Sequence, residues 1–156
     1  MKNKTVFDVN IWLSYFISGK SEKIIDMMEN NDVFFYRSAE LMSELIEVIN
    51  RPKFSKYFPN GTKEYISLVE ELAEFFLTKA IFDQCSDPKD NYLFDLAYQS
   101  HSNFLVSGDK KVLAVPVKQS LKLLTLSAFK ITIGINAEAL RAWLPRSVPF
   151  VVVPFR

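Results

Sequence analysis

Short apolar runs alternate with longer amphipathic segments along the chain. The runs are rich in β-branched and aromatic residues, which favours strands. They predict strands at residues 5–9, 32–38, 80–82, 103–107 and 121–126. Between them, apolar residues recur every three or four positions, which predicts helices. These helices are expected at residues 11–19, 22–31, 39–51, 62–80 and 88–101, with short ones at 110–115 and after 127.

Capping residues mark where several of these helices begin. Ser21, Ser38, Thr62 and Ser127 each precede an amphipathic segment and can accept a hydrogen bond from its first turn. Pro52 ends the segment that Ser38 begins, because the residue before a proline is restricted to extended backbone.

Strands that alternate with helices are typical of a parallel sheet covered on both faces. The predicted fold class is therefore α/β, a three-layer α/β/α arrangement with a central, mainly parallel sheet. A chain of 156 residues suits one domain with a sizeable core. We expect that domain to span residues 1–133 and its phenylalanines to fill the core.

Composition narrows the class of protein. Hydrophobic residues make up 49% and charged residues 24%, as in globular proteins. The net charge of +1 excludes a binder that holds duplex DNA by a strong basic excess. Cys85 is the only cysteine, so no internal disulfide can form, and we expect a reducing, cytoplasmic setting. No signal peptide or membrane-spanning run is expected.

Basic-residue usage changes near the carboxyl end. All 14 lysines lie at or before Lys130, whereas three of the five arginines and three of the seven prolines fall after residue 140. Residues 134–156 are therefore treated as a separate tail. Two interpretations stay open: an added or frame-shifted tail of different origin, and an apolar arm that packs on the domain or on a second subunit.

Four acidic residues from distant parts of the chain are predicted to meet. Asp8 and Asp109 follow predicted strands, Glu44 lies early in the helix after the second strand, and Asp90 lies in the first turn of another helix. Sites form where parallel strands end at one edge of the sheet. Asp90 shares the phase of the apolar residues of its helix, which is reasonable if that face opens onto this edge.

Carboxylates that share a site repel each other and take up protons unless a cation neutralises them. Oxygen ligands favour Mg²⁺ or Mn²⁺. A typical zinc site uses several histidines and cysteines, and this chain has one of each. A divalent cation activates water and stabilises charge on a phosphodiester. The pattern thus favours metal-dependent nuclease chemistry as a hypothesis.

Each acid also has a purely structural interpretation. Asp8 and Asp109 could be turn residues, and Asp90 could stabilise its own helix. Asp87 precedes Pro88 and is expected to cap that helix. Glu44 lies on an acidic helix face on which a neighbouring pair, Glu47 and Arg51, is spaced for a salt bridge.

Several segments together resemble the PIN domain, in particular the subfamily of toxin components of toxin–antitoxin pairs. They are VFDVNIWLSYFISG, SAELMSELIEVINRPKF, CSDPKDNYLFDLAYQSHSNFLVSGDKKVL and LLTLSAF, and they run in order from about residue 4 to about residue 130. The resemblance implies a three-layer α/β/α fold and a metal-dependent ribonuclease. It also implies a cognate antitoxin protein and a homodimer.

The resemblance also implies residue roles. The acidic set that would bind Mg²⁺ or Mn²⁺ and carry catalysis comprises Asp8, Glu44, Asp90 and Asp109. Asn10 and Ser107 would hold carboxylates or water by hydrogen bonds, with Asp87 as an auxiliary acid or a cap only. Lys110 and Lys111, which follow Asp109, are candidate RNA contacts, although both could be ordinary surface lysines. Val9 departs from the family pattern, where a small or hydroxyl residue is usual.

Two other functions remain as alternatives. A haloacid-dehalogenase-type phosphatase also uses an aspartate after its first strand, but it needs a second aspartate two residues later, where this chain has Asn10. The domain could also bind RNA or a partner protein without catalysis, with its acids serving only as caps and as ligands of structural magnesium.

Overall fold

The computed structural model describes residues 2–135, and within this range strands alternate with helices. The strands are β1 (Asn3–Phe7), β2 (Val33–Arg37), β3 (Ala73–Phe75), β4 (Phe104–Val106) and β5 (Lys122–Leu124). The α-helices are α1 (Val9–Ile17), α2 (Ser21–Asn30), α3 (Ala39–Ile49), α4 (Lys63–Leu72), α5 (Asn91–Gln99), α6 (Lys110–Leu113) and α7 (Leu126–Thr132). Two 3₁₀ helices, η1 (Pro52–Tyr57) and η2 (Pro88–Asp90), complete the order. The predicted tail lies outside the described residues from position 136 onward.

The strands form one sheet in the order β3-β2-β1-β4-β5, and every neighbouring pair is parallel. Phe7 at the end of β1 is in register with Val106 at the end of β4. Because the two central strands end together, the residues that follow them, Asp8 and Ser107, emerge at the same edge.

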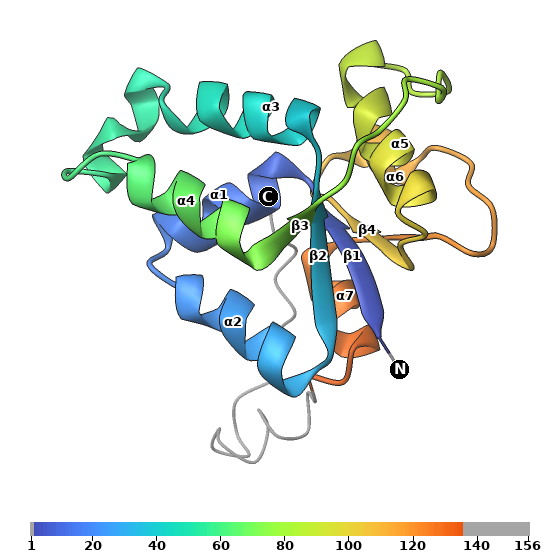
Figure 1. The fold of residues 1–156 in the computed structure, drawn as a ribbon, viewed down its shortest axis with the longest axis horizontal. Coiled ribbons are helices and arrows are strands. Elements are labelled where there is room, and N and C mark those ends of the chain that lie inside the picture. The colour runs from blue at the N-terminus through green and yellow to red at the C-terminus, as the bar shows by residue number, and fades with distance from the viewer. Residues whose placement is uncertain (1, 136–156) are drawn as a thin grey trace, which may run out of the picture.

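Helices cover both faces of this sheet. In Figure 1, α1 to α4 lie on one side of the sheet, and α5 and α6 lie on the other. Helix α7 packs on the side of α1, since the Phe129 ring contacts the Phe7 ring at a centroid distance of 5.6 Å. The predicted fold class is therefore confirmed, with a sheet whose five strands are all parallel.

The core is aromatic where the sheet meets α1 and α7. The Phe7 ring lies within 5.6 Å of the rings of Trp12, Phe35 and Phe129. The expectation that the phenylalanines are core is wrong at two positions, because Phe34 is 38% exposed and Phe75 is 48% exposed. Phe75 lies on β3, which has no neighbouring strand on its outer side within the described sheet.

The largest error of the sequence-based prediction concerns residues 62–80. Helix α4 ends at Leu72, and residues 73–75 form β3 instead of a further helical turn. The helical spacing of apolar residues in α4 continues past Leu72. At this point, however, the backbone amides and carbonyls of β2 are available to pair with another strand. The Phe76 amide donates to the Arg37 carbonyl at 2.8 Å, and Arg37 Nε donates to the Ala73 carbonyl at 3.0 Å. Tertiary pairing thus outweighs local helix propensity.

The strand expected at residues 80–82 is also wrong. These residues have no regular secondary structure. The amides of Ile81 and Phe82 donate to the Asp95 carboxylate, at 3.0 and 2.9 Å, and not to a neighbouring strand. A side chain of α5 therefore supplies the acceptors that a sheet would otherwise provide.

The predicted caps are partly confirmed. Ser38 accepts a hydrogen bond from the Leu41 amide at 3.2 Å and caps α3. The cap of α7 is Thr125, not Ser127, and α2 already includes Ser21. The Thr62 hydroxyl forms no cap bond, because it donates to Asn50 Oδ1 at 2.7 Å and ties the start of α4 to the end of α3.

Candidate active site

Asp8 is the most buried acid at the carboxyl edge of the sheet. It lies between β1 and α1, is 6% exposed, and its amide donates to the Val106 carbonyl at 2.9 Å, which continues the pairing of β1 with β4. The Ser107 hydroxyl donates to Asp8 Oδ2 at 2.7 Å. Asp8 is therefore fixed by its own strand and by the first residue after the neighbouring strand.

Ser107 connects Asp8 to Asp109. Its hydroxyl oxygen accepts a hydrogen bond from the Asp109 amide at 3.0 Å while its proton is donated to Asp8. The Asp109 carboxylate in turn accepts from the Lys111 amide at 2.9 Å and caps α6. A single hydroxyl thus sets the positions of two acids that are 101 positions apart along the chain.

Glu44 and Asp90 reach the same region from helices α3 and η2. The Tyr92 hydroxyl, on α5, donates to Glu44 Oε2 and so links α5 to α3. Asp90 ends η2 and is the N-terminal boundary residue of α5, where helix polarity favours a carboxylate. Asp87 caps η2 through a hydrogen bond from the Lys89 amide at 3.1 Å, so the predicted structural role of Asp87 is confirmed.

The charges of neighbouring acids act on Asp8 and on Asp90. The pKa of Asp8 is raised to about 6, mainly by burial and further by the charges of Glu44 and Asp109, although the bond from Ser107 opposes the shift. The pKa of Asp90 is also raised to about 6, by burial first and then by Asp8, Asp109, Asp87 and Glu44. Without a cation, part of this negative charge is therefore protonated near pH 6.

The donor set fits a hard divalent cation, because it consists of carboxylate oxygens that repel one another. Within residues 2–135, no three acidic, histidine or cysteine side chains are already close enough together to hold a metal ion. The acids thus share an electrostatic environment without forming a finished ligand shell. An ion would replace their repulsion by attraction and draw the carboxylates together.

The other predicted site residues lie at the margin of this region. Asn10 is exposed, and its side chain donates no hydrogen bond to any residue between positions 2 and 135. Lys110 and Lys111 are exposed in the first turn of α6, directly after Asp109. Both positions are compatible with a ligand or substrate contact, and their roles stay predictions.

A cavity of about 620 Å³ opens beside Glu44. Its lining combines Glu47, Arg51 and Lys89 with Tyr92. Arg51 forms the predicted salt bridge with Glu47, at 2.9 Å, but both side chains are largely exposed, so this pair contributes little to stability. The cavity offers both cationic and hydrogen-bonding groups next to the acids.

Tyr92 is a site residue that sequence reasoning missed. It lies two positions after Asp90, among the apolar residues of its helix, so the sequence alone suggests a core residue. Only the packing of α3 against α5 brings its hydroxyl to Glu44. Burial and then the charges of Asp90 and Asp87 raise the pKa of the Cys85 thiol to about 11, which disfavours a role for Cys85 as a nucleophile.

An all-parallel sheet with carboxylates coupled at its carboxyl edge defines an α/β protein with an acidic site. The chain belongs to the PIN-domain family, whose family model matches residues 4–111, most of the chain. PIN domains are generally nucleases and usually depend on divalent metals. No curated protein and no solved structure matches the chain significantly. No helix in the range 2–135 combines the length and the apolar character that crossing a membrane requires.

Proposed function

We propose that this protein is a Mg²⁺- or Mn²⁺-dependent endoribonuclease that hydrolyses RNA phosphodiester bonds. The observation that carries the proposal is the buried carboxylate of Asp8, which is coupled electrostatically to Glu44, Asp109 and Asp90. Burial raises the pKa of this carboxylate to about 6, and a bound cation would offset the cost of keeping it charged. Family membership supports the same chemistry.

In this proposal, Asp8, Asp90 and Asp109 hold the cation, and Glu44 binds it or orients the attacking water. When bound, a divalent cation lowers the pKa of water and stabilises the charge that develops on the phosphate. Ser107 holds the Asp8 carboxylate and the Asp109 backbone amide at once, which orients these two acids toward one region. Tyr92 does the same for Glu44.

Substrate contacts would come from groups around these acids. Lys110 and Lys111 follow Asp109 and can contact the RNA backbone without reading its sequence. The cavity beside Glu44 has room for part of a nucleotide, with Arg51 and Lys89 at its wall. Asn10 is exposed next to Asp8 and would hold water or a phosphate oxygen.

We further propose that the chain acts in the cytoplasm as the toxin of a toxin–antitoxin pair, that a cognate antitoxin protein restrains it, and that it forms a homodimer. The support is the resemblance of its motifs to that subfamily. In a growth assay, induced wild-type protein should arrest growth, whereas Asp8→Asn should not. Equal growth with both proteins would remove the toxin role but leave the nuclease proposal intact.

The direct test is RNA cleavage by purified protein with Mn²⁺, comparing the wild type with Asp8→Asn and Asp109→Asn. Both variants should lose at least about 100-fold in rate, because each removes a charged ligand. Asp83→Asn is the matched control, since Asp83 is exposed and is not coupled to these acids. Cleavage that survives both site substitutions would point to a contaminant or another site.

The two alternatives predict other results. A phosphatase of the haloacid-dehalogenase type would form a phosphorylated Asp8, and its missing general acid at Asn10 argues against it. A non-catalytic module would bind RNA equally well with and without Asp8→Asn and would never cleave it.

A further inference from the structure

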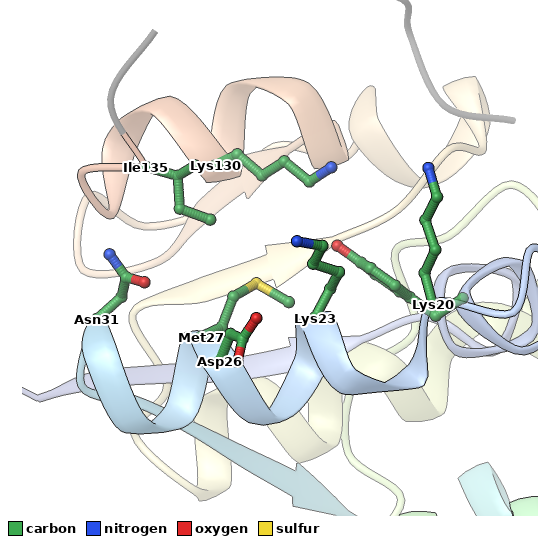
Figure 2. A pocket seen from close by; sticks show the side chains of 8 residues that line it. Lys20, Lys23, Asp26, Met27, Asn31, Lys130 and Ile135 are labelled. Atoms are coloured by element: carbon green, nitrogen blue, oxygen red, sulfur yellow. The ribbon is translucent and has the colours of Figure 1, made fainter. Parts of the chain in front are cut away.

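A second cavity lies apart from the acidic site, and its lining contains three lysines. It has a volume of about 420 Å³ and lies between α2 and α7 (Figure 2). Its lining residues are Tyr15, Lys20, Lys23, Asp26, Met27, Asn31, Lys130 and Ile135. Asp8 precedes α1 and Lys20 follows it, so the length of this helix, about 14 Å, separates the two sites.

Three lysines line this cavity, and none of them forms a salt bridge with a carboxylate within residues 2–135. Figure 2 shows Lys23 on α2 and Lys20 directly before this helix, with both side chains extending toward α7, where Lys130 lies. Over residues 2–135, the one salt bridge of the protein is that of Arg51 with Glu47, which leaves these lysines unpaired. Burial and then the charges of Lys20 and Lys23 lower the pKa of Lys130, which shows that the three charges act on one another.

The cavity also contains a buried donor that has no acceptor. Tyr15 is 5% exposed, and its hydroxyl forms no hydrogen bond with any described residue. The Lys130 ammonium lies 5.9 Å from the centre of the Tyr15 ring. A buried hydroxyl without a partner is costly, and an anionic oxygen that entered beside Lys130 would satisfy it.

The remaining lining residues define the size and charge of a fitting ligand. Asp26 is the one carboxylate of the lining, so three lysines leave an excess of two positive charges. This excess matches the double negative charge of a phosphate monoester near neutral pH. Met27 and Ile135 add an apolar wall for an organic group, and the volume lies within the range of small-molecule sites.

From these observations we propose that the cavity between α2 and α7 binds a small phosphate monoester of mononucleotide size. Lys20, Lys23 and Lys130 hold the phosphate oxygens, and the Tyr15 hydroxyl donates to one of them. This site is independent of the acidic site, because its charge has the opposite sign and would repel a metal cation.

Titration calorimetry on the full chain tests the proposal, with inorganic phosphate and adenosine 5′-monophosphate as separate probes. EDTA is present, so that no metal can bridge phosphate to the acids. We expect one saturable site, with weakening of at least about tenfold in Lys20→Gln/Lys23→Gln. The matched control is Lys63→Gln/Lys122→Gln, which removes two exposed lysines outside this cavity and should bind as the wild type does.

Tighter binding of the nucleotide than of phosphate would identify the monoester as the ligand, whereas equal affinities would restrict the site to the phosphate group and overturn its assignment to a mononucleotide. No binding of either probe, or equal weakening in both double variants, would overturn the site as a whole. Asp8→Asn should bind both probes like the wild type, so failure of the nuclease proposal would not affect this result.

Tyr15→Phe tests the hydroxyl separately. Without ligand this variant should unfold at the same temperature as the wild type or higher, because it loses an unsatisfied buried donor. Phosphate should raise its midpoint temperature of unfolding by less than it raises that of the wild type. An equal rise in both proteins would remove Tyr15 from the site.

Discussion

At the scale of single residues, the buried charge of Asp8 lowers the stability of the fold and at the same time provides a ligand for a cation. Its carboxylate is 6% exposed, and the hydrogen bond from Ser107 only partly offsets the burial, so that its pKa stays near 6. The charged form therefore destabilises the metal-free fold at neutral pH. A bound cation would convert this cost into binding energy, which is why we assign Asp8 as the central ligand.

Asp8→Asn should stabilise the metal-free protein at pH 7.5 by about 1–3 kcal/mol, because it removes a buried charge and keeps an acceptor for Ser107. Denaturant unfolding in EDTA measures this difference. The control is Asp83→Asn, which should change the free energy of unfolding by less than about 0.5 kcal/mol. A strongly destabilised Asp8→Asn would show that the charge supports the fold.

The stabilising effect of Asp8→Asn should depend on pH. The pKa of Asp8 in the folded protein, about 6, lies above the ordinary value of 3.8, so the folded state binds the proton more tightly. Protonation thus favours folding, and stability from this group falls as pH rises from about 4 through about 6. The difference in unfolding free energy between variant and wild type should be near zero at pH 4 and reach a plateau above pH 6. A constant difference across this range would contradict the raised pKa.

At the scale of elements, Asp95 organises the segment between β3 and η2. It is 5% exposed on α5 and accepts hydrogen bonds from the amides of Ile81 and Phe82 and from Gln99 Nε2. This segment leads to Asp87 and Asp90. The position of two acids at the site therefore depends on a carboxylate that has a structural role.

Asp95→Ala should destabilise the protein by about 2–4 kcal/mol, because two backbone amides lose their acceptor. Thermal unfolding measures the loss, and Asp83→Ala is the matched control, since Asp83 lies in the same segment and is exposed. If the two variants are equally stable, the backbone amides of Ile81 and Phe82 do not need Asp95.

The sequence predicted the elements well where local and tertiary signals agree. Ser38 caps α3 because its position, its residue type and the apolar phase after it all indicate the same boundary. Residues 73–75 were missed because their apolar spacing continues the helical pattern of α4, and only the open edge of β2 selects a strand. Such an edge is a property of the assembled sheet and leaves no local signature.

At the scale of the whole molecule, Asp8 and the lysine-lined cavity lie at opposite ends of α1. Asp8 and Asp109 follow the ends of β1 and β4, and the cavity between α2 and α7 has three lysines in its lining. The net charge of +1 does not reveal this separation, because the basic and acidic residues of the chain nearly balance in number. The parallel topology is also the reason why the sequence predicts the acids as a group, because strand ends of a parallel sheet share an edge.

The details of both sites could not be predicted from the sequence. The bond from Tyr92 to Glu44 depends on how α5 packs beside α3, and the unpaired Tyr15 hydroxyl depends on the position of α7. Side-chain contacts between helices that are distant in sequence follow from packing, which no spacing rule encodes.

Mg²⁺ or Mn²⁺ should raise the midpoint temperature of unfolding of the wild type at pH 7.5, because the cation binds only the folded state. At a concentration 100 times the dissociation constant, the gain is about 2.7 kcal/mol. Asp8→Asn should lose most of this gain, whereas Asp83→Asn should keep it. Equal gains in all three proteins would place the cation elsewhere.

The most direct test of the central claim is a crystal of the wild-type protein soaked in Mn²⁺ and measured at a wavelength where manganese scatters anomalously. We predict one or more anomalous peaks between Asp8, Asp90 and Asp109, with carboxylate oxygens drawn into contact with the ion. Anomalous density confined to other surfaces, or none at these acids at saturating Mn²⁺, would contradict a metal-dependent site at this edge of the sheet.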